Sequence, residues 1–302
     1  MKTHIIGMGA LGLLYASQIY HAQGRDSVAF ILDDVRYDKY KDTQTIINGK
    51  DIPFIRLRPC DASPADLVIV TVKGPGLQAA LDSLQTSVGH DTVIISLLNG
   101  IVSEQILSDR FGADKVIHCI AQGTDAACFG SSLTYTQKGQ LRIGITDKAL
   151  APKLDKLARF LDDCSIDHVV EQDILHRLWG KFMLNVGLNQ TCFVYDTNYG
   201  GVLQQSSLPR AIMVSAMREV LPIAAAEGVT LTENDIADYL LMLSTLDPGS
   251  MPSMAQDRIN RKKSEVDLFS GTVIRLGQAH GIPTPVNDWL YDRVTEIEKS
   301  YQ

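Results

Sequence analysis

The sequence predicts an α/β N-terminal domain with a doubly wound, mostly parallel sheet, followed by an all-helical C-terminal domain. Short β-branched runs alternate with helical stretches through the first half, a pattern typical of βαβ units. From Glu171 onward the strand signal nearly vanishes and helical periodicity dominates. The length of 302 residues also fits two domains of about 150 residues each. We therefore expect domains over residues 1–170 and 171–302.

In the first domain, the β-branched runs predict strands at 2–6, 28–32, 67–72, 92–97 and 115–121. Two shorter strand-like segments, 132–136 and 140–145, flank Lys138 and Gly139. They indicate either a hairpin or an antiparallel extension of the sheet. A helix at about 149–162 and a strand at 167–170 complete the domain.

In the second domain, apolar periodicity predicts helices at about 171–195, 205–227, 232–245, 252–279 and 285–299. Within 252–279, one apolar stripe is more typical of a core than of a partner-binding surface; its members are Ile259, Val266, Phe269, Val273 and Leu276. The turn-forming residues at 247–252 should break the helical array and could form a loop near a ligand.

The composition is that of a folded, enzyme-sized protein, with 45% hydrophobic and 21% charged residues. A net charge of −7 provides no global positive field to attract nucleic acid or an anionic membrane. No uninterrupted apolar run approaches the roughly 20 residues of a spanning helix. The five cysteines are scattered and contain no C-x-x-C pair, so neither a disulfide framework nor a zinc site is predicted. We expect a cytoplasmic protein that binds neither nucleic acid nor membrane.

A glycine motif follows the first predicted strand and begins the first helical pattern. It is G-x-G-x-x-G, formed by Gly7, Met8, Gly9, Ala10, Leu11 and Gly12. Such glycines permit a tight turn and the close approach of backbone N–H groups to a pyrophosphate, which then lies at the positive end of the helix. The motif therefore predicts dinucleotide binding by a Rossmann-type domain, although a plain glycine-rich turn is the alternative.

Asp33 ends the second predicted strand, about 20 residues beyond the last glycine. A carboxylate there can accept a hydrogen bond from the adenosine ribose 2′-hydroxyl and repels a 2′-phosphate, so Asp33 favours NADH over NADPH. Asp34 adds to the repulsion, whereas Arg36 would oppose it if its side chain folds back. The alternative is that both aspartates only begin a surface turn.

Lys73 and Asn99 each follow a predicted strand, at the edge where ligands bind in open parallel sheets. Lys73 could meet an anion or the cofactor, and Asn99 could contact the nicotinamide side or the substrate. A solvated charge and an ordinary Asn-Gly turn are the alternatives.

Lys181, Asn185 and Asn189 interrupt an otherwise apolar helix at a spacing of four residues, which places them along one face. Burying an ammonium and two amides without partners is costly, so the stripe indicates a cleft, water or a ligand, unless it simply faces solvent. Ser253 could bind a carboxylate together with an exposed helix start. Glu265 could pair with Lys181, or it could complete a surface line with Asp257 and Arg261.

Six segments are specific in their order and separation: GMGALG at 7–12, VTVK at 70–73, LNG at 98–100, WGKFMLN at 179–185, SMAQD at 253–257 and SEVD at 264–267. Together they resemble the ketopantoate reductase (2-dehydropantoate 2-reductase) family across nearly the whole chain. This resemblance implies a Rossmann domain joined to a helical domain, with the active site in the cleft between them.

The resemblance also implies roles for the candidate residues. Lys181 would be the general acid and would contact the substrate, and Glu265 would set its position and electrostatics. The contacts to the substrate's carboxylate and hydroxyl groups would come from Asn99, Asn185, Asn189 and Ser253. Lys73 would help to position cofactor or substrate, and the chemistry requires no metal.

The chain departs from the family pattern at two places. Many members present an arginine to the NADPH 2′-phosphate near the end of the second strand, where this chain has Asp33. Another substrate-facing asparagine of the family aligns with Asn198 or Tyr199.

We expect NAD(P)H-dependent reduction of 2-ketopantoate to pantoate, a step of pantothenate and coenzyme A biosynthesis. Two alternatives stay open: a reductase of another branched 2-oxo acid, and a non-catalytic dinucleotide-binding regulatory protein. The cationic and amide groups suit any 2-oxo carboxylate, whereas retention of Lys181 and Glu265 favours an enzyme. Many proteins of this fold pair through their helical domains, so a homodimer is a candidate assembly.

Overall fold

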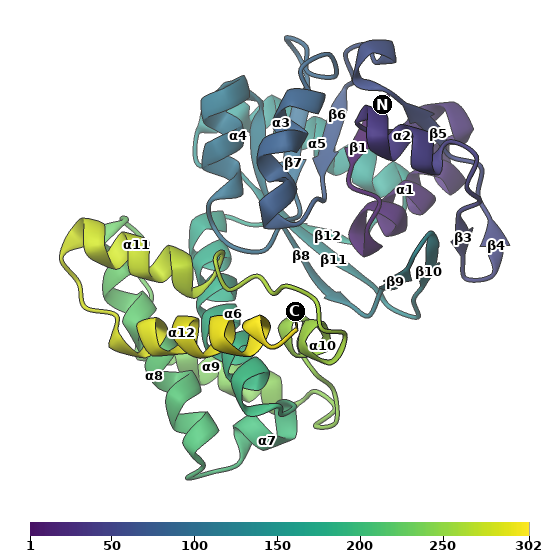
Figure 1. The fold of residues 1–302 in the computed structure, drawn as a ribbon. Helices are drawn as coiled ribbons and strands as arrows, with labels where there is room; N and C mark the ends of the chain where they lie inside the picture. Colours follow the sequence, from purple (N-terminus) through teal and green to yellow (C-terminus); the bar gives the residue numbers. More distant parts are fainter. Residues whose placement is uncertain (302) are drawn as a thin grey trace. The chain divides into compact units, whose positions relative to one another are not determined.

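The chain divides into two compact units, Met1–Ile174 and Leu175–Gln302, in a computed structural model that describes residues 1–301. The first unit is α/β and the second is built from helices and their connections (Figure 1). The predicted fold class is therefore confirmed. The division of function at residue 170, between dinucleotide binding and substrate binding with catalysis, stays a prediction.

The first unit is organised around an eight-stranded sheet. In spatial order the strands are β12 (His168–Val170), β11 (Lys138–Gly144), β8 (Val116–Thr124), β7 (Val93–Ser96), β6 (Leu67–Val70), β1 (Thr3–Ile6), β2 (Val28–Ile31) and β5 (Ile55–Leu57). Neighbours are parallel except β8 and β11, which are antiparallel. Every residue of β1, β2, β6 and β7 is buried, as expected for apolar runs covered on both faces.

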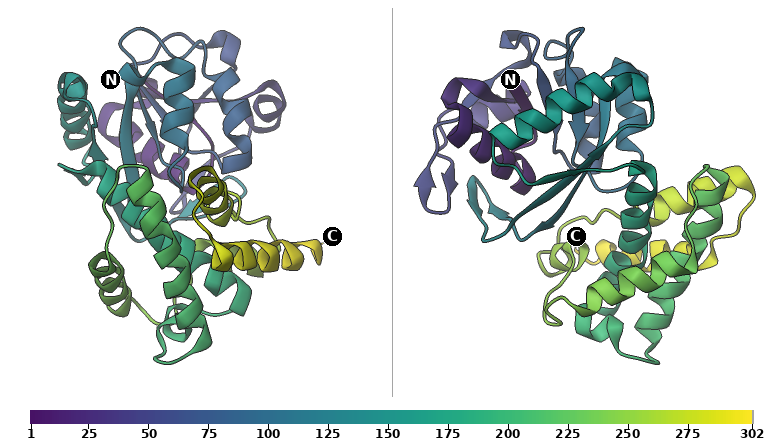
Figure 2. Two further views of the ribbon diagram at one scale, coloured as in Figure 1. Left: turned by 90° about the vertical axis from the view of Figure 1, so that its left-hand side faces the viewer. Right: turned by 180° about the vertical axis from the view of Figure 1, so that it is seen from behind.

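Helices cover both faces of this sheet (Figures 1 and 2). Consecutive residues of β1 point to opposite faces: Ile5 belongs to the core that includes side chains of α1 (Ala10–Gln23) and α5 (Ala151–Asp163). Ile6 belongs to the core shared with α3 (Leu77–Ser83) and α4 (Ser103–Phe111). The chain runs from β1 to β2 on one side and returns to β6 on the other, which creates a switch point beside β1.

The hairpin considered for residues 132–145 is wrong, and the alternative of an antiparallel extension is correct. β10 (Ser132–Thr134) pairs with β9 (Ala127–Phe129) and β3 (Ile46–Ile47) in a separate sheet that also contains β4 (Lys50–Asp51). β11 pairs with β8 instead. The Asp125 carboxylate accepts hydrogen bonds from the backbone N–H groups of Thr136 (3.0 Å) and Gln137 (2.8 Å), and this anchors the connection between β10 and β11.

The second unit contains α6 (Ile174–Tyr195, whose first residue lies in the first unit), α7 (Tyr199–Leu203), α8 (Leu208–Ala226), α9 (Glu233–Ser244), α10 (Ser253–Ile259), α11 (Ser270–His280) and α12 (Pro285–Lys299). Two glycines of α6 allow close packing of neighbouring helices. A Cβ on Gly180 would lie 2.8 Å from Tyr239 Oη of α9, and one on Gly187 would lie 2.5 Å from Met217 Cγ of α8. No helix within residues 1–301 has the length and apolar character needed to cross a membrane.

The single helix predicted at 252–279 is wrong, because α10 and α11 are separated by ten non-helical residues, 260–269. Arg261 adopts a left-handed backbone conformation (φ 49°), and the Ser264 N–H donates to Glu298 Oε1 at 2.7 Å instead of to a helical carbonyl. Val266 and Phe269 are still buried, but Ile259 is 62% exposed. The predicted stripe is therefore not continuous, and Asp257, Arg261 and Glu265 do not share one helix.

Candidate functional site

Candidate binding groups follow five adjacent strands at the carboxyl edge of the large sheet. Asn99 follows β7, Lys73 follows β6, the glycine turn follows β1, Asp33 follows β2 and Arg58 follows β5. At about 4.8 Å between neighbouring strands, the groups after β2 and β7 are separated by roughly 14 Å. An extended ligand that lies across the switch point can therefore meet several of them at once.

The glycine turn has the shape that dinucleotide recognition requires. Gly7 has a φ of 110°, and a Cβ there would lie 2.6 Å from Thr71 Oγ1. A Cβ on Gly12 would collide with the Gly7 carbonyl oxygen, so this position holds α1 close to the turn. Gly9 is different, because a Cβ there would meet no other atom within 4 Å. The space over Gly9 is thus open, as close approach of a pyrophosphate to the backbone requires.

The start of α1 offers backbone donors to an anion. Gly9 is the N-cap residue and provides no side-chain cap, and the first turn of the helix contains no acidic side chain. Met8, Ala10 and Leu11 are half-buried around the turn. A helix N-terminus without a capping side chain favours bound phosphate through its N–H groups and its dipole. The residues present therefore fit a dinucleotide.

Asp33 is the N-cap of α2 (Asp34–Tyr40) and is already engaged with Arg36. Its Oδ1 accepts from the Arg36 backbone N–H at 2.8 Å, and its Oδ2 lies 3.4 Å from Arg36 Nη1. The Arg36 side chain therefore does fold back onto Asp33. Both side chains are about half exposed, at 52% for Arg36 and 41% for Asp33, so the pair remains accessible to a ligand.

Arg58 is a second cation at this end of the sheet, and it was not predicted from the sequence because the short strand before it carries too little pattern. Its guanidinium lies over the Tyr37 ring, 4.7 Å from the centroid, and contacts Asp34 (3.4 Å) and Asp38 (2.9 Å). A hydrogen bond from Lys41, together with the nearby Arg58 charge, holds the pKa of Asp38 below its usual value. Two carboxylates thus offset the charge of Arg58.

Lys73 and Asn99 lie at the ends of neighbouring strands, as predicted. Lys73 is exposed and begins the short 3-10 turn Gly74–Gly76. Asn99 is half-buried in the loop between β7 and α4, next to Gly100, whose φ is 98°. What these two side chains bind stays a prediction.

In the second unit, Lys181 and Asn185 interrupt the buried surface of α6. All other residues from Leu178 to Phe193 are buried, while these two are partly exposed. Trp179 and Phe182 pack edge to face with their ring centroids 5.8 Å apart, which fixes the helix around Lys181. Within the stripe, Lys181 and Asn185 are thus partly exposed on a helix that is otherwise buried over this stretch, and Asn189 is buried, so the stripe is not one face of an ordinary amphipathic helix.

Asn189 forms one hydrogen-bonded network with two other predicted substrate residues, Asn185 and Ser253. It is only 4% exposed, and its Nδ2 donates to Asn185 Oδ1 at 3.1 Å. Its Oδ1 accepts from Ser253 Oγ at 3.2 Å and from the Met254 backbone N–H at 3.1 Å. Asn189 thus occupies one N–H group at the start of α10, and binding of a carboxylate by Ser253 and this helix start stays a prediction.

A second link fixes α10 on α6. Arg258 Nη1 donates to the carbonyl oxygens of Phe193 and Val194, the latter at 2.9 Å, near the end of α6. A guanidinium at a helix C-terminus satisfies terminal carbonyls and matches the helix dipole. Ser253 and Arg258 thus hold α10 at both ends, and Ser253 stays beside Asn189.

Glu265 lies in the non-helical segment between α10 and α11 and is partly exposed. Its neighbours Ser264 and Val266 are 5% and 1% exposed and anchor the segment. Its carbonyl oxygen accepts from the Leu268 backbone N–H at 2.9 Å. The break in the helix therefore gives Glu265 a fixed backbone, and its pairing with Lys181 stays a prediction.

The two residues aligned with the family's further asparagine belong to the start of α7. Asn198 is the N-cap, and its Oδ1 accepts from the Gly201 N–H at 3.0 Å. The Tyr199 N–H donates to the Ser250 carbonyl at 3.1 Å, which attaches the 247–252 loop to this helix. Burial raises the pKa of the Tyr199 phenol.

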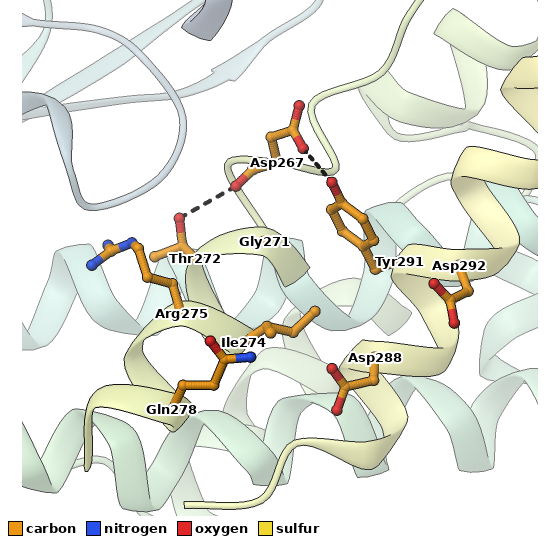
Figure 3. A pocket seen from close by; sticks show the side chains of 9 residues that line it. All are labelled: Asp267, Gly271, Thr272, Ile274, Arg275, Gln278, Asp288, Tyr291 and Asp292. Carbon is orange, nitrogen blue, oxygen red and sulfur yellow. Dashed lines mark hydrogen bonds between the residues drawn. The ribbon is translucent and has the colours of Figure 1, made fainter. Parts of the chain in front are cut away.

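A cavity of about 500 Å³ lies between α11 and α12 (Figure 3). Its described lining residues are Asp267, Gly271, Thr272, Ile274, Arg275, Gln278, Asp288, Tyr291 and Asp292. Tyr291 Oη donates to Asp267 Oδ1 at 2.8 Å, and this hydrogen bond raises the pKa of the phenol. This lining contains three carboxylates and no residue of the Asn189 network, so the cavity suits an anionic substrate poorly.

Comparison with known proteins gives matches along nearly the whole chain. The family model "Ketopantoate reductase PanE/ApbA" matches residues 3–148, and "Ketopantoate reductase PanE/ApbA C terminal" matches residues 173–298. A 2-dehydropantoate 2-reductase of Vibrio cholerae is 23% identical over 312 residues, covering 100% of this chain and 99% of the relative.

Solved structures share the fold. A PanE/ApbA family ketopantoate reductase from Ralstonia eutropha JMP134 has a TM-score of 0.83 and 26% identity, with 100% of both chains covered. D-mandelate dehydrogenase, solved with NADH and anilino(oxo)acetate, has a TM-score of 0.87 and 22% identity, covering 100% of this chain and 99% of the other.

Proposed function

The chain belongs to the ketopantoate reductase family of oxidoreductases, and we propose that it reduces 2-ketopantoate (2-dehydropantoate) to pantoate, supplying pantothenate and coenzyme A. The hydrogen-bonded set of Asn185, Asn189 and Ser253, one turn along α6 from Lys181, carries this proposal. It concentrates amide and hydroxyl groups beside a cation, the chemistry that a hydroxylated 2-oxo carboxylate requires. The name of the Vibrio cholerae relative supports the same substrate.

A nicotinamide dinucleotide is the proposed cofactor, held by the glycine turn and by the N-terminus of α1. Gly9 would face the pyrophosphate, Asp33 the adenosine ribose, and Lys73 and Asn99 the remaining length of the cofactor. When bound, the reduced nicotinamide supplies the hydride that adds to the keto carbon. The open space at Gly9 and the lack of a capping side chain at the start of α1 support this assignment.

Lys181 is the proposed general acid. Its ammonium would donate a proton to the keto oxygen as negative charge develops there, which stabilises the transition state more than the ground state. Glu265 would favour the charged form of Lys181 and fix its position. Asn99, Asn185 and Ser253 would bind the carboxylate and hydroxyl groups, and Asn189 would orient Asn185 and use its second amide N–H.

Replacing Lys181 tests this assignment. We expect Lys181→Ala to lower kcat by about 100-fold or more, the range typical of a lost general acid, while the Kd for dinucleotide changes little. Lys299→Ala, which removes an exposed lysine of α12, is the control and should retain full turnover. Near-normal kcat in Lys181→Ala would refute the assignment of Lys181 as the proton donor.

NADH is the proposed preferred form of the cofactor. Asp33 presents a carboxylate where a 2′-phosphate would lie, Arg36 pairs with that same carboxylate, and Arg58 is held by Asp34 and Asp38. The folded-back Arg36 offsets part of the repulsion between Asp33 and a 2′-phosphate, but neither arginine offers an unopposed positive charge. The ratio of kcat/KM for NADH to that for NADPH tests this directly, and a ratio below one would show that the arginines outweigh Asp33.

Reduction of another branched 2-oxo acid is the second candidate function. The likeness to D-mandelate dehydrogenase, solved with the 2-oxo carboxylate anilino(oxo)acetate, favours it. Competition between ketopantoate, 2-ketoisovalerate and 2-ketoisocaproate in one assay separates the two. A large preference for either of the last two would overturn ketopantoate as the substrate.

A further inference from the structure

A buried carboxylate lies beneath the loop that carries Asn99. Glu104 is 4% exposed and occupies the first turn of α4, directly after that loop. Burying a carboxylate is costly unless hydrogen bonds and favourable charge compensate for it. The helix N-terminus provides favourable charge, but a surface position in the same turn would have obtained that benefit without desolvation. The burial of Glu104 therefore points to a role beyond helix capping.

Two buried serines connect Glu104 to the backbone of the loop. Ser103 Oγ donates to Glu104 Oε2 at 2.9 Å, and Ser96 Oγ donates to Ser103 Oγ at 2.8 Å. The Leu98 backbone N–H in turn donates to Ser96 Oγ at 3.3 Å. Ser96 and Ser103 are 0% and 2% exposed. Each donor in this chain thus points toward the carboxylate.

The direction of these hydrogen bonds gives the charge a specific effect. A carboxylate polarises the Ser103 hydroxyl, which polarises the Ser96 hydroxyl, and each becomes a better acceptor for the donor before it. The last donor is the Leu98 N–H, immediately before Asn99. Gly100, immediately after Asn99, has a left-handed φ of 98°. Asn99 therefore lies between a hydrogen-bonded amide and a fixed turn.

We propose that Glu104, acting through Ser103 and Ser96, is a positioning residue that holds Asn99 in place for its contact with the nicotinamide side of the cofactor. This inference rests on the proposed dinucleotide-dependent function. Glu104 itself touches neither cofactor nor substrate in this account. Weakening the Glu104 chain should disturb the nicotinamide half of the site and leave the adenosine half, at β2 and β5, unchanged.

The test compares NADH with ADP-ribose, which lacks nicotinamide, by calorimetry on the full chain. The variants are Glu104→Gln, which keeps the shape and removes the charge, and Ser96→Ala, which removes the acceptor of the Leu98 N–H. Asp109→Asn removes an exposed carboxylate from the same helix and is the matched control for charge. Ser83→Ala, at a partly exposed position of α3, is the control for the hydroxyl. kcat and hydrogen exchange at the Leu98 amide are measured on the same proteins.

We expect both variants to weaken NADH binding by about tenfold, with ADP-ribose affinity within about twofold, and to lower kcat by roughly 10-fold to 100-fold. Exchange at the Leu98 amide should become faster, and both controls should match the wild type. Equal losses of affinity for NADH and ADP-ribose, or no loss for either, would overturn the proposal. In an active enzyme, faster hydrogen exchange at the Leu98 amide with an unchanged kcat would also overturn it.

The outcome also separates this proposal from the proposed function. If the wild type reduces no 2-oxo acid but the NADH and ADP-ribose affinities still diverge in the variants, the function fails and the positioning role stands. If the wild type reduces ketopantoate but the affinities do not diverge, the positioning role fails alone. A wild type that binds neither ligand overturns both.

Discussion

Alanine at Gly9 and at Gly12 should have different effects, and the difference tests the dinucleotide site most sharply. A Cβ on Gly9 meets no other atom within 4 Å, and the φ of −89° is accessible to alanine. A Cβ on Gly12 collides with the Gly7 carbonyl oxygen. Both positions belong to one G-x-G-x-x-G motif, so each variant controls for the other.

The contacts set the expected magnitudes. For Gly9→Ala we expect the free energy of unfolding to change by less than about 0.5 kcal/mol, because the new methyl group touches no protein atom. For Gly12→Ala we expect a loss of about 1–3 kcal/mol, since α1 or the turn must shift to relieve the overlap. The Gly9 methyl group instead fills the space through which a pyrophosphate would approach the backbone, so NADH affinity should fall by about tenfold, or about 1.4 kcal/mol.

Urea unfolding gives the stability of both variants, and calorimetry with NADH gives their affinity. Gly9→Ala should be stable but weak in NADH binding, whereas Gly12→Ala should be impaired in both measurements. Normal NADH affinity in a folded Gly9→Ala variant would refute the assignment of this turn as the pyrophosphate site.

Three further predictions concern other parts of the molecule. Asn189→Ala removes three hydrogen bonds and should lower the free energy of unfolding by about 2–4 kcal/mol; a loss below about 1 kcal/mol in urea unfolding would show that the network does not hold α10 on α6. Burial, with a contribution from the Lys2 charge, lowers the pKa of His4 to about 4, so the unfolded chain binds the extra proton between pH 6.5 and 4 and stability falls as the pH drops through that window. Between pH 7 and pH 5 the loss in the free energy of unfolding should be about 2 kcal/mol. This loss should be absent in His4→Leu and unchanged in the control His90→Gln. If His4→Leu keeps the pH dependence of the wild type, His4 is not its cause. Asp33→Ser keeps a capping oxygen for α2 and removes the charge, so the ratio of kcat/KM for NADH to that for NADPH should fall at least tenfold; an unchanged ratio would exclude Asp33 as the determinant.

The central strands β1, β2, β6 and β7 could be predicted closely from sequence because each is a continuous apolar run that is fully buried. The glycine turn could also be predicted from sequence, since local backbone geometry dictates its residue types. The two-residue and three-residue strands β3, β4 and β5 carry too little pattern to be recognised. Arg58, which follows β5, was missed for that reason, although its position depends only on the parallel pairing of β5 with β2.

The break at 260–269 was not predicted, because the local apolar pattern continues through it and one of the contacts that anchor it comes from a residue distant in sequence. The apolar positions around Val266 and Phe269 keep helical spacing, while the Ser264 N–H is bound by Glu298, 34 residues further on. The burial of Glu104 was also hidden, since an acidic residue in the first turn of a helix normally faces solvent. Conversely, the four-residue spacing of Lys181, Asn185 and Asn189 did indicate that polar groups line one face of an otherwise apolar helix, α6.

The proposed reaction is best tested by the initial rate of cofactor oxidation with ketopantoate, comparing NADH and NADPH at matched concentrations for the wild type and Lys181→Ala. We predict turnover by the wild type, faster with NADH, and a loss of about 100-fold or more in Lys181→Ala. Binding of dinucleotide without oxidation of either cofactor, with ketopantoate or with other branched 2-oxo acids, would contradict the proposed reductase function and indicate a regulatory binding protein.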